Sequence, residues 1–381
     1  MMRFLAPRFL LALSCFFFPF AVGAQTAPAP VLAAKSWVLV DHATGQALTG
    51  NDPDGRVEPA SLTKLMTAYL TFAALKAGTI NEEQVVPVSE RAWRQEGSRM
   101  YIEPRKTVTV GELIRGVIVQ SGNDACVALA ELLAGDEESF VGLMNREAER
   151  LGMKNTRFAN SNGLPDPGHY STARDLAILA SAIIRDFPEY YGFYSIKSYT
   201  YNGIEQPNRN RLLWLDPTVD GMKTGHTRAA GHCLVSSARR GPRRLVAVVL
   251  GAASETVRAQ ESLKLLNYGF QFYDTVRLYS AGQSLSRFRV WKGKEDWVDA
   301  GFSRDFILSL PRDKANRIEA VLESRQPVLA PLTEGQEIGT LKLTIDGETY
   351  GQYPVVALKE VPLAGFFGRL WDAIVLWFKS L

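Results

Sequence analysis

The alternation of apolar and polar residues predicts a region of mixed helices and strands that extends to about Tyr273. Helical repeats predict helices at 61–77, which Gly78 closes, and at 110–119, 124–134, 137–151, 173–185 and 255–268. In the helix at 173–185, Thr172 and Asp175 have the spacing of a capping box. Short apolar runs predict strands at 37–40, 46–48, 233–237 and 244–250. We therefore expect a sheet flanked by helices, in which strands from both ends of this region lie side by side.

The pattern changes from about Asp274 onwards, where helical periodicity is weak. Strand-like runs at 306–310, 318–322, 340–345 and 354–358 are separated by turn signals such as Asp346-Gly347. These features predict a second, smaller, all-β domain at 274–360. The fold class is then α+β, with a larger first domain at 25–273 and a separate terminal segment at 361–381.

The terminal segment predicts an amphipathic helix. Its apolar face contains Phe366, Phe367, Leu370, Trp371, Ile374, Val375, Trp377, Phe378 and Leu381, and its polar face contains Arg369, Asp372, Lys379 and Ser380. A helix with two tryptophans beside cations suits a membrane interface, and its charges make spanning unfavourable. Residues 362–381 are therefore predicted to bind the membrane surface. A helix that packs on its own domain and a dimer contact are the alternatives.

Residues 1–24 have the layout of a signal peptide. Arg3 and Arg8 precede an apolar run, and Val22-Gly23-Ala24 supplies small residues for cleavage. A retained N-terminal anchor is the alternative. Cleavage removes two positive charges, so the formal net charge of +3 falls to +1. An exported and nearly neutral mature chain gives no indication of nucleic acid binding.

The cysteines and the other metal-ligand residues predict no metal and no cofactor. After signal cleavage Cys126 and Cys233 remain, and both lie in apolar stretches. Two cysteines in a secreted chain of this length do not form a disulfide framework, so we interpret them as buried small residues. No His/Cys/Asp cluster has metal spacing, and no glycine-rich loop follows a strand as a nucleotide site requires.

Three short motifs are candidates for one active site: Ser61-Leu62-Thr63-Lys64, Ser121-Gly122-Asn123 and Lys223-Thr224-Gly225. Each alone is a common sequence, typical of a helix surface, a turn and a hairpin respectively. A serine at a helix start has free backbone N–H groups nearby, and a lysine three residues later lies on the same face. Lys64 can act as a base only if its pKa is lowered, for which burial beside the cation of Lys223 is our hypothesis.

The other motif residues have distinct predicted roles. Ser121 is suited to relay a proton towards a leaving amine, and Asn123 to orient Lys64 and a substrate amide. Lys223 and Thr224 are suited to bind an anion. Gly225 is predicted to let a ligand approach the backbone closely.

In this order and about 60 and 100 residues apart, the motifs resemble those of the penicillin-recognising serine acyl-transferases. Longer stretches are similar to the low-molecular-mass penicillin-binding proteins, and most of all to the D-alanyl-D-alanine carboxypeptidases of the peptidase S11 family. The stretches that carry the resemblance are 59–67, 120–126, 170–175, 208–210, 220–227 and 258–262. The resemblance extends over nearly all of the mature chain and implies a penicillin-binding/β-lactamase-like first domain.

The resemblance also implies a reaction. Ser61 would attack the bond between the two D-alanines of a peptidoglycan pentapeptide, and water would hydrolyse the acyl-enzyme. The backbone N–H groups of Ser61 and His226 would form the oxyanion hole, and Thr224, Arg209 and Arg258 would bind the terminal carboxylate. β-Lactam antibiotics would acylate the same serine. The enzyme would be periplasmic, tethered to the outer face of the cytoplasmic membrane.

The sequence departs from the family pattern at two points, and three alternatives to the carboxypeptidase interpretation are considered. Arg211 follows Asn210 where the family tends to have a small residue, and the gap between the first two motifs is shorter than usual. A class A β-lactamase usually has an aspartate at the position of Gly122 and lacks a second domain. A D,D-endopeptidase that cuts cross-links differs only in its carboxylate pocket, and Arg209 and Arg258 favour the carboxypeptidase. A non-catalytic envelope-binding protein would not need the complete set of catalytic residues.

Overall fold

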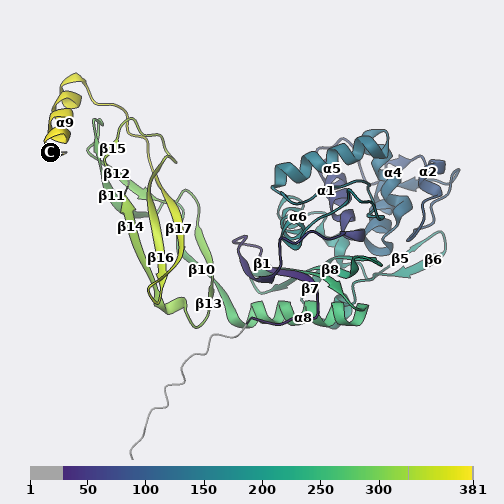
Figure 1. The fold of residues 1–381 in the computed structure, drawn as a ribbon. Helices are drawn as coiled ribbons and strands as arrows, with labels where there is room; N and C mark the ends of the chain where they lie inside the picture. Colours follow the sequence, from purple (N-terminus) through teal and green to yellow (C-terminus); the bar gives the residue numbers. More distant parts are fainter. Residues whose placement is uncertain (1–28, 325, 380–381) are drawn as a thin grey trace, which may run out of the picture.

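A computed structural model describes residues 29–324 and 326–379. The predicted signal peptide and its cleavage site lie outside the described residues. Figure 1 shows two parts side by side, a sheet surrounded by helices and an elongated β structure. They are joined where helix α8 (Glu255–Phe272) continues directly into strand β10 (Tyr273–Tyr279).

The first part is built on a five-stranded antiparallel sheet in the order β2-β1-β9-β8-β7. Its strands are β1 (Ser36–Asp41), β2 (Ala47–Asn51), β7 (Val219–Thr227), β8 (Gly231–Arg240) and β9 (Arg243–Ala252). Strand β1 pairs with β9, so the early and late strands lie side by side as predicted. Strand β7 is at the edge, which leaves one side of it open to other elements.

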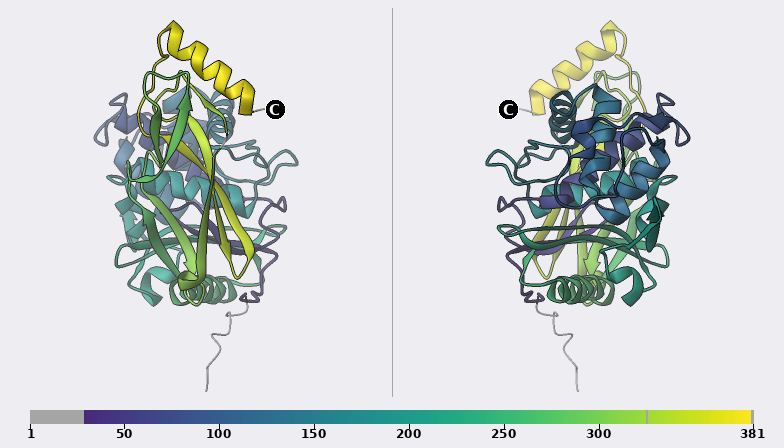
Figure 2. Two further views of the ribbon diagram at one scale, coloured as in Figure 1. Left: turned by 90° about the vertical axis from the view of Figure 1, so that its left-hand side faces the viewer. Right: turned by 90° about the vertical axis from the view of Figure 1, so that its right-hand side faces the viewer.

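The two faces of the sheet pack against different elements. Trp37 and Leu39 of β1 belong to a core cluster that contains Leu265 of α8, while Val38 and Val40 belong to the cluster of the helical side. This alternation follows from the two-residue period of a strand. Figure 2 shows the helices on one side of the sheet and α8 on the other.

The helical side contains α1 (Lys64–Lys76), α2 (Glu90–Trp93), α3 (Val110–Arg115), α4 (Asn123–Ala134), α5 (Glu137–Leu151) and α6 (Ala173–Asp186). The predicted helix at 61–77 begins as a 3-10 turn, η1 (Ala60–Thr63), and the one at 110–119 ends in a π-helical turn, η2 (Gly116–Gln120). At α6 the Thr172 hydroxyl accepts a hydrogen bond from the Asp175 N–H at 3.1 Å, the first half of the predicted capping box. The Asp175 carboxylate instead accepts from the Asn155 N–H and the Thr156 hydroxyl. The short elements are β3 (Val85–Val86), β4 (Val108–Thr109), β5 (Ser198–Tyr201), β6 (Ile204–Pro207), η3 (Tyr191–Ser195) and α7 (Leu212–Leu215).

The second part is an all-β structure with its own core. A six-stranded sheet has the order β14-β16-β17-β12-β11-β15, and β10 pairs with β13. The strands are β11 (Ser284–Trp291), β12 (Trp297–Gly301), β13 (Phe306–Pro311), β14 (Ile318–Ser324), β15 (Val328–Leu329), β16 (Glu337–Ile345) and β17 (Glu348–Ala357). The four predicted strand runs correspond to β13, β14, β16 and β17. The strands β10, β11, β12 and β15 were not predicted from the sequence.

Polar contacts join the two parts near the β1–β2 hairpin. The Gln46 side chain donates to the Tyr350 hydroxyl at 2.7 Å and accepts from the Ser309 N–H at 3.0 Å. The Thr275 hydroxyl donates to Asp41 at 2.6 Å. These contacts lie far from the end of the β structure that carries the terminal helix (Figure 1).

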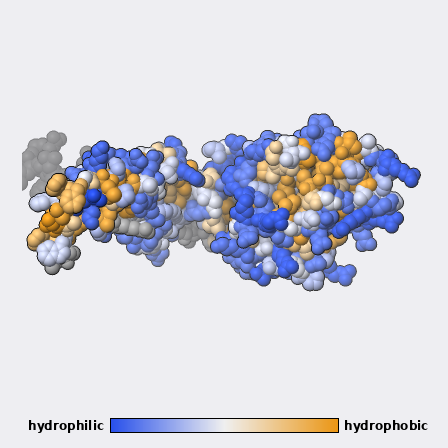
Figure 3. All heavy atoms as spheres, turned by 90° about the horizontal axis from the view of Figure 1, so that it is seen from above, coloured by the Kyte–Doolittle hydropathy of each residue, from blue (hydrophilic) through white to orange (hydrophobic). Residues whose placement is uncertain are grey.

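The terminal helix is α9 (Phe366–Lys379), at the end of the β structure opposite α8. Phe366, Phe367, Leu370, Trp371, Ile374, Trp377 and Phe378 are exposed. Figure 3 shows this apolar surface gathered at the end of the molecule. Among the described residues, no helix is both long enough and apolar enough to cross a membrane.

Candidate active site

Ser61 and Lys64 lie together at the start of the first long helix. Ser61 is in η1, and Lys64 is the first residue of α1. The Lys64 Nζ donates to Ser61 Oγ at 3.0 Å, to Asn123 Oδ1 at 2.7 Å and to the Asn162 carbonyl at 2.5 Å. When the amine is neutral, two N–H groups can keep the two amide oxygens while the lone pair accepts the Ser61 hydroxyl proton. The first motif thus has the geometry of a nucleophile and its base.

The second motif begins where the π-helical turn η2 ends. Ser121 has a left-handed backbone conformation with φ of 60°, and α4 starts at Asn123. The Asn123 side chain accepts from Lys64 and donates to the Glu96 carbonyl at 2.6 Å. The Ser121 hydroxyl accepts from Lys223 Nζ at 2.9 Å. The tight turn therefore presents two side chains, separated by Gly122, to different lysines.

The third motif lies on the edge strand β7, beside η1. A Cβ atom on Gly225 would lie 3.0 Å from the Pro59 carbonyl oxygen and 3.2 Å from Leu62 Cγ. Real Cβ atoms rarely approach so closely, so the glycine lets β7 pack directly against the segment that carries Ser61. Close approach of a ligand to the backbone at Gly225 stays a prediction.

Burial is the main reason why the pKa of Lys64 falls from its ordinary value to about 8. The Arg209 guanidinium lowers it further, while Cys126 and Asp124 raise it. Our hypothesis named Lys223 as the neighbouring cation, but Arg209 is the one that lowers the Lys64 pKa. A substantial fraction of Lys64 is neutral near pH 8, as a general base requires.

The pKa of Lys223 is also lowered well below its ordinary value. Burial is the largest cause, followed by the positive charges of Lys64 and Arg209. Its Nζ donates to Ser121 Oγ and, at 3.0 Å, to the Thr224 carbonyl. The two lysines therefore lie in one desolvated, electropositive site, in which the positive charge of Lys64 disfavours the charged form of Lys223.

Arg209 and Arg258 come from separate elements and meet beside β7. Arg258 is buried in the first turn of α8, and its Nη2 donates to the Arg209 carbonyl at 3.2 Å. Within the described part of the chain, Arg258 Nε has no hydrogen-bond partner. The exposed Arg209 side chain donates to Ser98 Oγ at 2.8 Å. A buried guanidinium with an unused donor is suited to an anionic ligand.

His226 follows Gly225 on β7, and its side chain is exposed. The ring stacks on His232 of β8 with centroids 4.2 Å apart. Both rings line a cavity of about 640 Å³ together with Lys35 and Arg228. The imidazole thus faces this cavity, while the predicted role of His226 involves only its backbone N–H.

The segment Ser161-Asn162-Gly163 was not predicted from the sequence to be part of the site. It contacts Lys64 through the Asn162 carbonyl. Glu137 at the start of α5 accepts from the Ser161 N–H at 3.1 Å and from its hydroxyl at 2.7 Å. Arg91 pairs with the same carboxylate at 2.6 Å. This network holds the backbone whose Asn162 carbonyl binds Lys64.

Gly163 lets this segment pack closely against η1. Its φ is 91°, and a Cβ atom at this position would lie only 1.9 Å from the Ala60 carbonyl oxygen. The Asn-Gly pair is a turn signal that predicts a loop at this point. It gives no indication that the loop packs against η1, about 100 residues away in the sequence.

The structure also shows the positions of the two cysteines and of Thr224. Cys126 and Cys233 are buried and free, as predicted. Thr224 is buried on β7 next to Lys223.

A helix-flanked antiparallel sheet with a serine, two buried lysines and an arginine pair defines a serine acyl-transferase of the penicillin-binding class.

Comparison with known proteins identifies the family within this class. The family model described as D-alanyl-D-alanine carboxypeptidase, Peptidase_S11, matches residues 23–254, and that of the penicillin-binding protein 5 C-terminal domain matches 273–363. The chain therefore belongs to the peptidase S11 family and is a serine-type D-alanyl-D-alanine carboxypeptidase. This family membership excludes two of the alternatives from the sequence analysis, a class A β-lactamase and a non-catalytic envelope-binding protein.

Individual relatives agree over most of their length. D-alanyl-D-alanine carboxypeptidase DacC of Escherichia coli is 43% identical over 98% of this chain and 97% of its own. DacA of the same organism is 43% identical over 92% of this chain and 89% of its own. The crystal structure of penicillin binding protein 5 from Haemophilus influenzae has a TM-score of 0.84 at 42% identity, and covers 87% of this chain and 98% of that one.

Proposed function

We propose that this carboxypeptidase removes the terminal D-alanine from peptidoglycan stem pentapeptides through an acyl-enzyme on Ser61. The observation that carries the proposal is the 3.0 Å contact of Ser61 Oγ with the buried amine of Lys64. Neutral Lys64 takes the hydroxyl proton as Ser61 Oγ attacks the carbonyl carbon between the two D-alanines. The backbone N–H groups of Ser61 and His226 stabilise the oxyanion.

The proton then passes to the leaving amine, so that free D-alanine departs and the ester on Ser61 remains. Ser121 is placed to relay this proton because it hydrogen-bonds Lys223, and Asn123 orients the amine of Lys64. Lys64 next removes a proton from water, which attacks the ester, and gives this proton to Ser61 Oγ as the ester bond breaks and the tetrapeptide leaves. The lysine is regenerated in its starting state, and no cofactor takes part.

Arg209 and Arg258 account for the preference of the enzyme for a peptide with a free terminal carboxylate. We propose that Arg209, Arg258 and Thr224, beside Lys223, bind the free carboxylate of the terminal D-alanine. In a cross-linked dimer the acceptor stem takes the place of the terminal D-alanine that this pocket binds, so the pocket favours the carboxypeptidase over the alternative D,D-endopeptidase. A β-lactam presents a similar carboxylate and is expected to acylate Ser61. The crystal structure of Penicillin-Binding Protein D2 from Listeria monocytogenes in an ampicillin-bound form, with a TM-score of 0.59 and 31% identity, supports this expectation.

We expect the purified mature enzyme to release D-alanine from a diacyl-D-Ala-D-Ala peptide and from a stem pentapeptide. It should leave cross-linked dimeric muropeptides uncut, because the bulky acceptor stem takes the place of the terminal D-alanine that the pocket binds. Chromatography of the muropeptides and a D-amino acid oxidase assay measure the two activities. Cleavage of the dimers at a rate similar to that of the pentapeptide would favour the endopeptidase.

We also propose that α9 lies in the outer surface of the cytoplasmic membrane and tethers a periplasmic enzyme. Phe367 and Trp371 are 83% and 67% exposed, an unfavourable arrangement in water. Asp372 on the polar face accepts from the Lys292 N–H at 2.5 Å, which attaches the helix to the β structure. This contact leaves Phe366, Phe367 and Trp371 exposed to a membrane interface, while Leu376 and Trp377 line a cavity with Lys292 of the β structure.

Deleting residues 362–381 is expected to release the mature protein from membranes with little change in kcat. Vesicle flotation measures the binding, and the peptide assay measures the activity. Phe367→Asp should weaken flotation because it places a charge on the apolar face, whereas Arg369→Lys on the polar face, which keeps the positive charge, is the matched control. Flotation of the deletion variant would contradict the proposal, and a deletion that changes only the oligomeric state would favour the dimer contact.

A further inference from the structure

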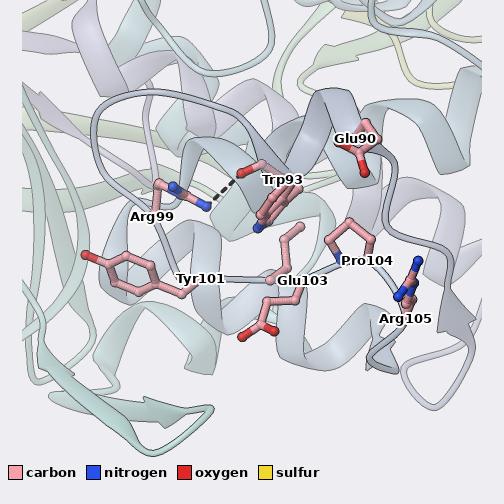
Figure 4. Close-up of a pocket in the computed structure, with 8 residues that line it drawn as sticks. Glu90, Trp93, Arg99, Tyr101, Glu103, Pro104 and Arg105 are labelled. Carbon is pink, nitrogen blue, oxygen red and sulfur yellow. Dashed lines mark hydrogen bonds between the residues drawn. The ribbon is translucent and has the colours of Figure 1, made fainter.

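A second cavity lies outside the three motifs, on the loop between α2 and β4. It has a volume of about 390 Å³ and is lined by Glu90, Trp93, Arg99, Tyr101, Ile102, Glu103, Pro104 and Arg105 (Figure 4). The proposed mechanism uses none of these side chains. The gap between the first two motifs, where the chain is shorter than is usual in the family, contains this loop.

The same loop contacts the catalytic residues directly. Ser98 accepts from the Asn123 N–H at 2.7 Å through its carbonyl, and from Arg209 at 2.8 Å through its hydroxyl. Asp124 accepts from the N–H groups of Met100 and Tyr101 at 3.0 and 2.8 Å. One loop therefore borders the active site and lines the cavity, so a substrate that reaches both would be bound at two points.

The acidic side chains of the cavity already have cationic partners. Glu90 pairs with Arg94 at 3.0 Å, and Glu103 pairs with Lys106 at 2.8 Å. Their negative charges are therefore compensated within the loop itself. A ligand would meet the remaining charges of the cavity, which are positive.

Those remaining charges belong to Arg99 and Arg105. The Arg99 Nη2 donates to the Trp93 carbonyl at 2.7 Å, and its Nε has no partner among the described residues. The exposed Arg105 forms no hydrogen bond or salt bridge within residues 29–324 and 326–379. Both guanidinium groups thus retain donors for an acceptor from outside the chain.

The cavity also has an apolar middle. Figure 4 shows Trp93 and Pro104 between Arg99 and Arg105, which lie towards opposite ends of the lining. An indole ring and a proline ring pack against aliphatic or planar groups without requiring hydrogen bonds. The complementary ligand is an extended segment that carries carboxylates and has an apolar or planar middle.

We propose that this cavity binds the free carboxylates of the stem peptide, at residues that precede the terminal D-Ala-D-Ala. The inference rests on the proposed function, in which the same peptide enters the active site. Stem peptides carry such carboxylates between their attachment to the glycan and the terminal D-alanines. Arg99 and Arg105 would bind them as charge-assisted pairs. The cavity would then determine the preference of the enzyme for long, unamidated substrates.

The test uses two synthetic pentapeptides that end in D-Ala-D-Ala and differ only in one glutamate, free in one and amidated in the other. The wild type should show a kcat/KM about fivefold higher for the free acid, the range of one partly exposed ion pair. Arg105→Gln should remove this preference, and Arg105→Lys should retain part of it. Arg146→Gln, an exposed arginine on α5 outside the cavity, is the matched control and should leave the preference as in the wild type.

The outcomes separate this inference from the proposed function. Equal kcat/KM of the wild type for both pentapeptides, or an unchanged preference in Arg105→Gln, would overturn the cavity as a carboxylate site. A wild type that releases D-alanine from neither pentapeptide nor diacyl-D-Ala-D-Ala would overturn the proposed function instead. A loss of activity in Arg105→Gln that is equal for both pentapeptides would also count against the cavity, because it would indicate a disturbed loop.

Discussion

Ser61→Ala is expected to abolish both labelling by a fluorescent penicillin and release of D-alanine from diacyl-D-Ala-D-Ala. Removal of a nucleophile from a serine hydrolase lowers kcat by roughly 10⁴-fold or more. The substitution should change the stability of the fold little, because among the described residues Ser61 Oγ forms one side-chain hydrogen bond, with Lys64. Gel fluorescence measures the covalent adduct, and a coupled D-alanine assay measures turnover.

Ser195→Ala is the matched control for this experiment, since its exposed hydroxyl bonds only the Gly192 carbonyl within η3. Both activities should persist in this control. A penicillin adduct that survives Ser61→Ala would falsify the assignment of the nucleophile. Circular dichroism of both variants checks that the fold is intact.

Lys64→Met is expected to lower the acylation rate by about 10³-fold, within the range for loss of a general base. Lys64→Arg should be comparably impaired, because a guanidinium keeps the charge but cannot accept a proton at accessible pH. Stopped-flow acylation by a chromogenic β-lactam measures the rate. Lys76→Met, at the exposed end of the same helix, is the matched control and should retain the wild-type rate.

The pH dependence of the wild type follows from the pKa of Lys64, which burial lowers to about 8. The active form is the neutral amine, so acylation should be slow at pH 6, rise through pH 8 and level off above it. An amine with an ordinary pKa would still be gaining activity above pH 9. A rate that is flat from pH 6 to pH 9, or a fully active Lys64→Arg variant, would contradict the role of Lys64 as base.

Local sequence signals account for much of the first motif and of the sheet. Ser61 and Lys64 are three residues apart, so a helical turn alone brings them together. The strand pattern of Trp37 to Val40 fixes which side chains face α8 and which face the other helices. Such features depend on neighbours in the sequence, and they could be predicted.

Features that depend on the path of the chain could not be predicted in this way. The π-helical turn before Ser121 continues an apolar pattern that is typical of an ordinary helix, and its left-handed end is visible only in the structure. The hypothesis that Lys223 lowers the pKa of Lys64 named a plausible cation. Burial, which the same hypothesis included, is the largest cause of the lowered pKa, and the cation that lowers it further is Arg209. Which cation comes near Lys64 depends on how distant segments meet, because Arg209 and Lys223 are both far from Lys64 in the sequence.

The sequence by itself determined the reaction class, since the types and order of the motif residues define a serine nucleophile, a lysine base and an anion site. It also determined the amphipathic character of the terminal helix. Only the tertiary structure decided how these residues become reactive. Desolvation of Lys64, its contact with the Asn162 carbonyl and the packing of Gly225 against η1 require segments about 100 residues or more apart to meet. Burial and long-range contact are properties of the folded chain, and they convert the three motifs into one site.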